Sequence, residues 1–163
     1  MSSAALLSEH VREEIERWKA RFPDGRQRSA VIGALHAAQH ENDGYLTPEL
    51  MDAVAEYLEL PSIQVYEVAT FYSMFQTKPV GRHNVAICTN VSCMLRGADD
   101  IVEHVENRLG VKLGESTGDG RIYLKREEEC LAACCGAPMM MVDHKYYENL
   151  TKEQVDAILD GLD

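Results

Sequence analysis

Cysteine is absent from the first 87 residues of this 163-residue chain, and long apolar runs are absent throughout. No run of about 18 or more apolar residues occurs, which argues against a membrane-spanning helix. The amino terminus lacks a basic start followed by an apolar run, so no secretory signal is expected. With 16 Lys and Arg against 27 Asp and Glu, the net charge of −11 argues against binding nucleic acid or anionic lipid. We therefore expect a soluble, cytoplasmic protein that is not inserted in a membrane.

Two motifs with known chemistry are also missing. No G-x-G-x-x-G pattern follows a predicted strand, so the chain has no fingerprint for a dinucleotide or a flavin. No C-x-x-C pair occurs either, although structural zinc knuckles and thiol–disulfide oxidoreductases both favour that spacing. The isolated chain is therefore not expected to oxidise NADH, and we assign it no catalytic residue of its own.

The first half of the chain has helical periodicity. Apolar residues recur at three- and four-residue spacing in four segments that begin near a capping residue or a proline, over residues 8–22, 29–41, 48–58 and 61–75. This pattern predicts a four-helix bundle.

The pattern changes after Pro79-Val80-Gly81. Short apolar runs bounded by turn residues predict strands over 85–87, 122–124, 139–142 and 146–147, and helices are predicted over 98–109 and 152–162. Gly110 can end the first of these helices, and Thr151 and Gln154 form a capping box at the start of the second. The sequence therefore predicts an α+β protein with a helical bundle over 1–80 and a second domain over 81–163.

All five cysteines lie between residues 88 and 135, mainly as two close pairs. Cys88 and Cys93 follow a predicted strand in C-T-N-V-S-C, and Cys130 and Cys134 lie in C-L-A-A-C before another strand. If those strands are neighbours, both loops leave the same edge of a sheet and four thiolates can surround one inorganic centre. Spacing favours an iron–sulfur cluster over zinc, although a zinc-stabilised interaction module remains an alternative. Spacing alone does not choose between Cys134 and the adjacent Cys135.

Several longer strings resemble a known family. The strings A-L-H-A-A-Q-H-E-N-D-G-Y-L-T-P at 34–48, V-Y-E-V-A-T-F-Y-S-M-F at 65–75 and G-A-P-M-M at 136–140, together with the two cysteine loops, are similar to the E subunit of bacterial NADH:quinone oxidoreductase, respiratory complex I. The mitochondrial flavoprotein 2 subunit is its equivalent. The resemblance implies an N-terminal helical bundle followed by a thioredoxin-like 2Fe-2S ferredoxin domain.

The resemblance also implies a cofactor, its ligands and partners. One 2Fe-2S cluster per chain would be held by Cys88, Cys93, Cys130 and Cys134. Single electrons would be exchanged with FMN in the flavin-bearing F subunit, which also binds NADH, and the multi-cluster G subunit would be a neighbour. The complex would place the chain in a peripheral arm on the cytoplasmic face of the inner membrane. An alternative parent is an NAD-linked hydrogenase or formate dehydrogenase, whose diaphorase uses the same module.

Two residues depart from the family pattern. Ala132 stands where the second cysteine loop usually has glycine, and Cys135 is an additional cysteine for which we expect no ligand role. Three glutamates, Glu127 to Glu129, directly precede Cys130. Because reduction makes such a cluster more negative, we predict that these carboxylates lower its reduction potential, with backbone N–H groups around Gly136 opposing them.

Overall fold

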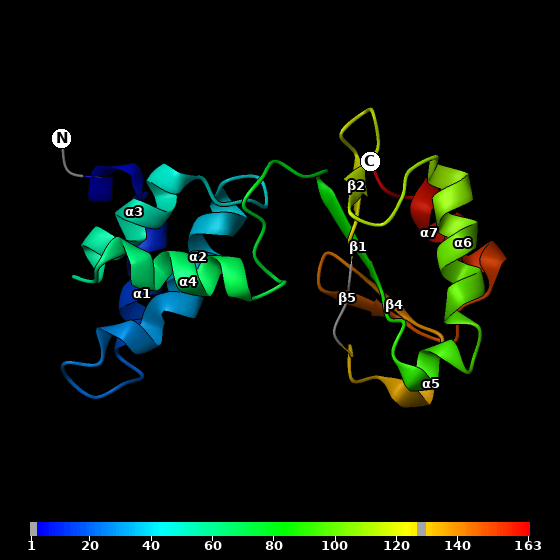
Figure 1. Ribbon diagram of the computed structural model, residues 1–163, viewed down its shortest axis with the longest axis horizontal. Coiled ribbons are helices and arrows are strands. Elements are labelled where there is room, and N and C mark those ends of the chain that lie inside the picture. Colours follow the sequence, from blue (N-terminus) through cyan, green and yellow to red (C-terminus); the bar gives the residue numbers. More distant parts are fainter. Residues whose placement is uncertain (1–2, 127–129) are drawn as a thin grey trace. The chain divides into compact units, whose positions relative to one another are not determined.

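The computed structural model describes residues 3–126 and 130–163 (Figure 1). Backbone contacts divide the chain into two compact units, residues 1–79 and 80–163, and each is described by itself. Across the described residues, no helix combines the length and apolar character needed to cross a bilayer. Glu127, Glu128 and Glu129 lie outside the described residues, so their effect on the potential stays a prediction.

The first unit is built from α-helices that begin where the sequence predicts. Ser8 accepts a hydrogen bond from the Val11 N–H, and Thr47 accepts one from the Leu50 N–H, so both side chains satisfy helix-terminal donors. After a short 3-10 turn at Ser3–Leu6, the helices are α1 (Glu9–Lys19), α2 (Val31–Glu41, preceded by a 3-10 turn at Gln27–Ala30), α3 (Pro48–Tyr57) and α4 (Ser62–Phe71).

Two of these helices end three or four residues earlier than predicted. The first ends at Lys19 rather than near Phe22, because Pro23 disfavours a helical conformation in the residue before it. The fourth ends at Phe71 rather than Phe75, because Tyr72 has extended backbone angles, with φ −87° and ψ 126°. The segment after α4 instead packs through Phe75, which is buried.

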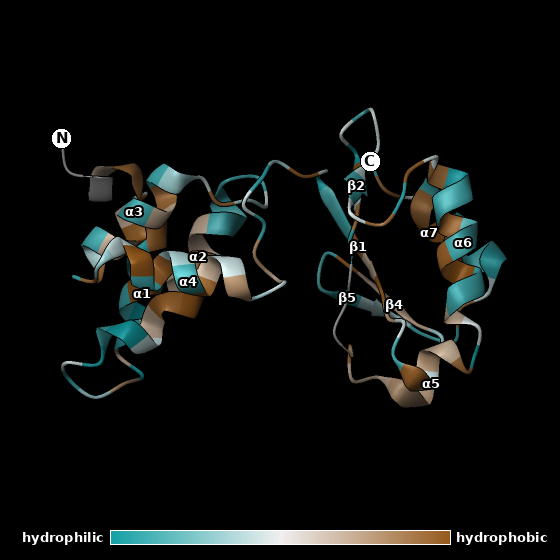
Figure 2. Cartoon of the chain, in the orientation of Figure 1, coloured by the Kyte–Doolittle hydropathy of each residue, from teal (hydrophilic) through white to brown (hydrophobic). Residues whose placement is uncertain are grey.

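One hydrophobic core holds the four helices together. Each helix contributes fully buried side chains to it, among them Ile15, Leu35, Val54 and Val65. Figure 2 shows the matching alternation of brown and teal along these helices, as expected of amphipathic segments. The buried Gln39 amide accepts the Gln76 N–H at 2.8 Å and donates to the Met74 carbonyl at 3.1 Å, which fastens the segment after α4 to α2.

The second unit contains a five-stranded sheet in the order β2-β3-β1-β4-β5. The α+β fold class and the predicted helices and strands are confirmed, whereas β2 and the one-turn helix α5 were not predicted. The elements are β1 (His83–Ile87), α5 (Val91–Met94), α6 (Ala98–Leu109), β2 (Glu115–Ser116), β3 (Ile122–Leu124), a 3-10 turn (Cys134–Gly136), β4 (Met140–Val142), β5 (Lys145–Tyr147) and α7 (Lys152–Asp160).

Helices α6 and α7 lie side by side against the sheet (Figure 1). Their inward side chains share one core with the central strands, including Val105 of α6 and Val155 of α7. Both predicted helix ends are present: Gly110 ends α6 in the left-handed conformation at φ 68°, and Thr151 and Gln154 form the capping box of α7. This packed layer makes the sheet a rigid support for the loops at its edge.

The strand order determines where the two cysteine loops lie. Strand β1 is parallel to β3 and antiparallel to β4, with Val85 paired to Leu124 and Ile87 paired to Met140. The ends of β1 and β3 and the start of β4 therefore share one edge of the sheet. The chain that joins β3 to β4 must cross the end of β1, which leads directly into Cys88.

The close approach of Gly81 to β3 supports this arrangement and can be tested. A Cβ atom at Gly81 would lie 2.6 Å from the Tyr123 nitrogen, so Gly81→Ala requires backbone movement at the start of the β1–β3 pair. We expect a loss of about 1–3 kcal/mol in the free energy of unfolding, measured by denaturant titration. Gly118→Ala is the matched control, because no atom lies within 4 Å of its added Cβ. Equal stabilities for the two variants would contradict the described packing.

Candidate metal centre

The first cysteine loop is anchored to the sheet. Cys88 immediately follows β1, and its N–H donates to the Met139 carbonyl at 3.2 Å, which extends the β1–β4 pairing by one residue. Asn90 then starts α5, with its side-chain oxygen accepting the Val91 N–H at 2.9 Å. This short helix returns Cys93 toward the sheet, so that Cys88 and Cys93 are both buried.

The second cysteine loop presents its thiols more openly. Cys130 and Cys134 are exposed, whereas Leu131 between them is buried. Ala132 has φ 59°, in the left-handed region, and its N–H donates to the Cys130 sulfur at 3.4 Å. Cys134 begins the 3-10 turn that ends at Gly136.

The two loops meet in a small core of their own. Cys88 and Cys93 from the first loop pack with Leu131 and Ala137 from the second and with Met139 at the start of β4. The second loop is also tied to the segment before α7, because the Asn149 N–H donates to the Gly136 carbonyl at 2.6 Å. Residues far apart in the sequence are thereby held around one group of thiols.

The Cys88 thiol interacts with both loops. Burial raises its pKa, but hydrogen bonds from the Leu131 and Asn90 backbone N–H groups and contacts with the Cys93 and Cys130 thiols outweigh burial, and the net pKa is lowered. Hydrogen bonds to the anionic form thus favour a thiolate at Cys88. The contact with Cys130 is a direct link between the first and second loops.

The pKa of the Cys93 thiol is raised rather than lowered. Burial, a hydrogen bond with Cys88 and the charge of Cys88 raise the pKa of Cys93 to about 11, although the Met139 backbone N–H opposes this shift. The charge of Cys134 raises it further. Hydrogen bonds therefore link the Cys88 thiol to Cys130 and Cys93, whereas Cys134 acts on Cys93 through its charge.

Cys135 is exposed next to Cys134 in the 3-10 turn. Within residues 3–126 and 130–163, no three His, Cys, Asp or Glu side chains are grouped so that they could hold a single metal ion. A 2Fe-2S cluster takes four thiolates across two irons. The two loops offer two thiols each, and the Cys88 thiol is hydrogen-bonded to Cys93 and Cys130, so the donor set is chemically of the kind that such a cluster needs.

The backbone donors around the thiols are the functional groups that sequence reasoning missed. We expected backbone N–H groups around Gly136 to face the cluster. Gly136 itself is not one of them, because its N–H donates to the Ala133 carbonyl at 2.9 Å within the 3-10 turn. The groups directed at sulfur belong instead to Leu131, Ala132 and Asn90 in the loops and to Met139 beside β4. The sequence contained one indication of this backbone conformation: Ala132 stands where the family pattern has glycine, the residue that most readily adopts a positive φ.

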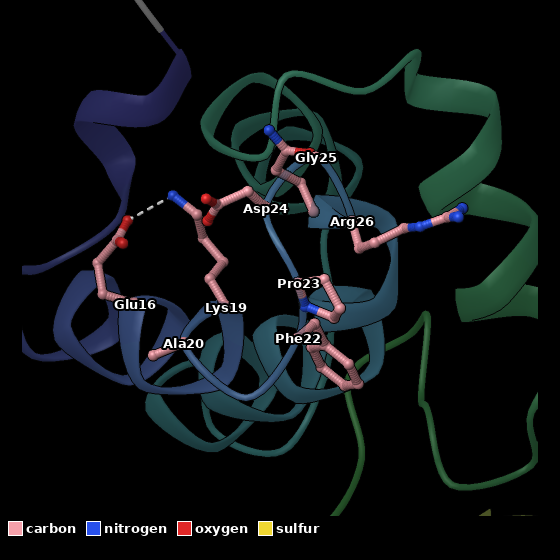
Figure 3. Close-up of a pocket in the computed structure, with 9 residues that line it drawn as sticks. Glu16, Lys19, Ala20, Phe22, Pro23, Asp24, Gly25 and Arg26 are labelled. Atoms are coloured by element: carbon pink, nitrogen blue, oxygen red, sulfur yellow. Dashed lines mark hydrogen bonds and ion pairs between the residues drawn. The ribbon is translucent and has the colours of Figure 1, made fainter.

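The helical unit carries an open hollow of about 310 Å³ between the end of α1 and the following turn (Figure 3). Glu16 and Lys19 form an ion pair across 2.8 Å on its wall, and Arg26 points away from them. The hydrogen bond from Lys19 lowers the pKa of the Glu16 carboxyl. Because Glu16 and Lys19 pair with each other, we interpret this hollow as a structural feature rather than a ligand site.

Comparison with protein families identifies the fold and its cofactor. The family model described as thioredoxin-like [2Fe-2S] ferredoxin matches residues 15–163, which is most of the chain. The chain belongs to this ferredoxin family. The cofactor of these ferredoxins is a 2Fe-2S cluster, and the thiols that the two loops supply are chemically suited to it.

Curated relatives of this ferredoxin are components of a larger complex. The NADH-quinone oxidoreductase E subunit of Rickettsia bellii is 44% identical over 142 residues, covering 87% of this chain and 84% of that one. The E 2 subunit of the Rhizobium meliloti NADH-quinone oxidoreductase is 45% identical over 151 residues, covering 93% and 88% of the two chains. This ferredoxin is thus similar over nearly its whole length to components of a multisubunit oxidoreductase.

Solved structures share the fold of this ferredoxin. The air-oxidised NAD+-reducing [NiFe]-hydrogenase contains a chain that matches 77% of this one with a TM-score of 0.66 and 21% sequence identity. The H2-reduced form matches with a TM-score of 0.67. The match spans about a fifth of those longer chains, and at this identity the likeness concerns the fold alone.

The difference in burial between the loops predicts a labelling pattern for the apoprotein. Cys130, Cys134 and Cys135 are exposed, so iodoacetamide should modify them at least about tenfold faster than Cys88 and Cys93, which react only after local opening. Peptide mass spectrometry at timed intervals measures the rates. Labelling in denaturant is the control, in which the five rates should converge. Rapid native labelling of Cys88 or Cys93 would contradict the described packing.

Proposed function

We propose that Cys88, Cys93, Cys130 and Cys134 hold the 2Fe-2S cluster, one per chain. The observation that carries this proposal is the convergence of two loops at the end of β1, with the Cys88 thiol in contact with thiols of both loops. Thiolates suit iron, and the two loops offer two thiols each.

Cys134 is our choice over Cys135 as the fourth ligand. Of these two neighbours, Cys134 is the one whose charge raises the pKa of Cys93, which supports its position beside the other thiols. In a 3-10 turn successive side chains point in directions about 120° apart, so adjacent cysteines address different sides of the turn. The resemblance to the family motif supports the same assignment.

We propose further that the protein is the electron-transfer component of the NADH-oxidising module of an NADH:quinone oxidoreductase. The relatives that carry the E subunit name support this role, with 44% and 45% identity over most of the chain. When bound, a 2Fe-2S cluster can accept one electron from a reduced flavin and return it. The four cysteines fix its position, and the buried pair shields one side of the site from water.

The resemblance to the family implies the partners. The sequence has no G-x-G-x-x-G fingerprint for a dinucleotide, so another chain must bind NADH, and the resemblance makes that chain the flavin-bearing F subunit with its FMN, with the multi-cluster G subunit as a further neighbour. The assembled complex would hold this chain in a peripheral arm at the cytoplasmic face of the inner membrane. The net charge of −11 supports protein partners rather than nucleic acid.

A diaphorase component of an NAD-linked hydrogenase or formate dehydrogenase is the second candidate. The fold likeness to the NAD+-reducing [NiFe]-hydrogenase favours it, at 21% identity. The NADH-quinone oxidoreductase relatives are about twice as similar in sequence and match chains of comparable length, which supports the first assignment. A zinc-stabilised interaction module is the alternative from another class.

Metal and sulfide analysis tests the cluster and its ligands. The purified protein should be brown and contain about two iron atoms and two acid-labile sulfides per chain. Replacing Cys88, Cys93, Cys130 or Cys134 with alanine, one at a time, should lower the cluster content at least about tenfold, because each change removes a ligand. Cys135→Ala is the matched control and should retain full content. A colourless, zinc-loaded protein, or cluster loss in Cys135→Ala alone, would contradict the proposal.

Purification of the intact complex tests the partner assignment. An affinity tag on this chain, expressed in its own cells, should recover a flavin-containing protein together with NADH-dependent reduction of a quinone. The tag alone on an unrelated protein is the control. Recovery of a nickel-containing hydrogenase or of a formate dehydrogenase, identified by mass spectrometry, would support the second candidate instead.

A further inference from the structure

We infer that Ala132, held in the left-handed region, positions the Leu131–Ala132 peptide so that its N–H faces the Cys130 sulfur and raises the reduction potential of the site. This inference rests on the proposed cluster and its ligand Cys130. Ala132 acts as a positioning residue, because its own side chain supplies no donor.

Two successive backbone donors converge on the thiols. The Ala132 N–H donates to the Cys130 sulfur at 3.4 Å, and the preceding N–H, of Leu131, donates to the Cys88 sulfur. Consecutive N–H groups that point into one concavity form an anion-binding nest, an arrangement found at many iron–sulfur sites. Two neighbouring backbone N–H groups therefore donate hydrogen bonds to one thiol from each loop.

The backbone angle at Ala132 determines whether the second donor can point this way. Because the peptide unit is planar, turning Ala132 to a negative φ while the flanking chain stays in place would rotate the Leu131–Ala132 peptide. The Leu131 carbonyl oxygen would then approach the position of the N–H. Leu131 is buried in the small core with Cys88 and Ala137, which limits other adjustments. The observed φ of 59° keeps the donor on the sulfur.

The position of this N–H has an electrostatic consequence. The charge of a 2Fe-2S centre with four thiolates becomes more negative by one unit on reduction. The positive end of an N–H dipole at a ligand sulfur favours the more negative state, whereas a carbonyl oxygen there disfavours it. The orientation of one peptide plane should therefore change the equilibrium for reduction, even with all four cysteines in place.

Substitutions at Ala132 separate backbone conformation from side-chain loss. Glycine and asparagine tolerate a positive φ, whereas valine strongly disfavours it. We expect Ala132→Gly and Ala132→Asn to keep the wild-type reduction potential. Ala132→Val should shift the potential to more negative values, with the equilibrium constant for reduction falling about tenfold. Redox titration of the loaded protein, followed by electron paramagnetic resonance, measures the potential.

Ala132→Asn is the matched control, because asparagine also enlarges the side chain at this position but tolerates φ 59°. It should leave the potential unchanged. An Ala132→Val protein with full cluster content and an unchanged potential would overturn this inference while leaving the proposed function intact. Wild-type protein without a 2Fe-2S cluster would instead refute the proposed function.

A second measurement tests the same inference if the Ala132→Val protein does not bind the cluster. Reduced wild-type protein labelled with 15N-alanine should show nitrogen couplings in pulsed electron paramagnetic resonance, and Ala132→Gly labelled in the same way should lose one of them. Couplings that are unchanged in Ala132→Gly, or absent from wild type, would show that the Ala132 N–H does not contact the cluster ligands.

Discussion

The order of three strands is the constraint on which the metal centre depends. Because β1 lies between a parallel neighbour and an antiparallel one, the chain that leaves β3 must pass the end of β1 before it enters β4. The first cysteine loop begins at that same end, with Cys88 directly after Ile87. Cysteines about 40 residues apart are thereby brought together by hydrogen-bonded backbone that belongs to the second unit alone.

The two loops differ in how exposed their thiols are. The first loop buries Cys88 and Cys93, whereas the second leaves Cys130 and Cys134 exposed, so one side of the centre is shielded and the other is accessible. Placing several thiolates together would be unfavourable without compensation, because like charges repel at short range. Backbone N–H groups provide part of that compensation at Cys88, Cys93 and Cys130.

Much of this architecture could be predicted from the sequence, because many elements begin and end at residues with specific capping chemistry. Ser8, Thr47 and Thr151 mark helix starts, and Gly110 marks a helix end. Strand β2 and helix α5 were missed because such short elements depend on tertiary packing rather than on a periodic pattern. The fourth helix was predicted four residues too long because Phe75 continues the apolar pattern beyond the residue at which the backbone turns.

Less of the metal centre than of the fold could be predicted from the sequence. Spacing indicated two cysteine pairs and the family resemblance favoured Cys134 over Cys135, whereas every backbone donor depended on the path of the loop. The direct test is iron K-edge X-ray absorption on the loaded protein. We expect only sulfur atoms bonded to iron, with iron–iron scattering from a second metal. An iron without a neighbouring iron, or a zinc edge in its place, would contradict a four-thiolate 2Fe-2S centre.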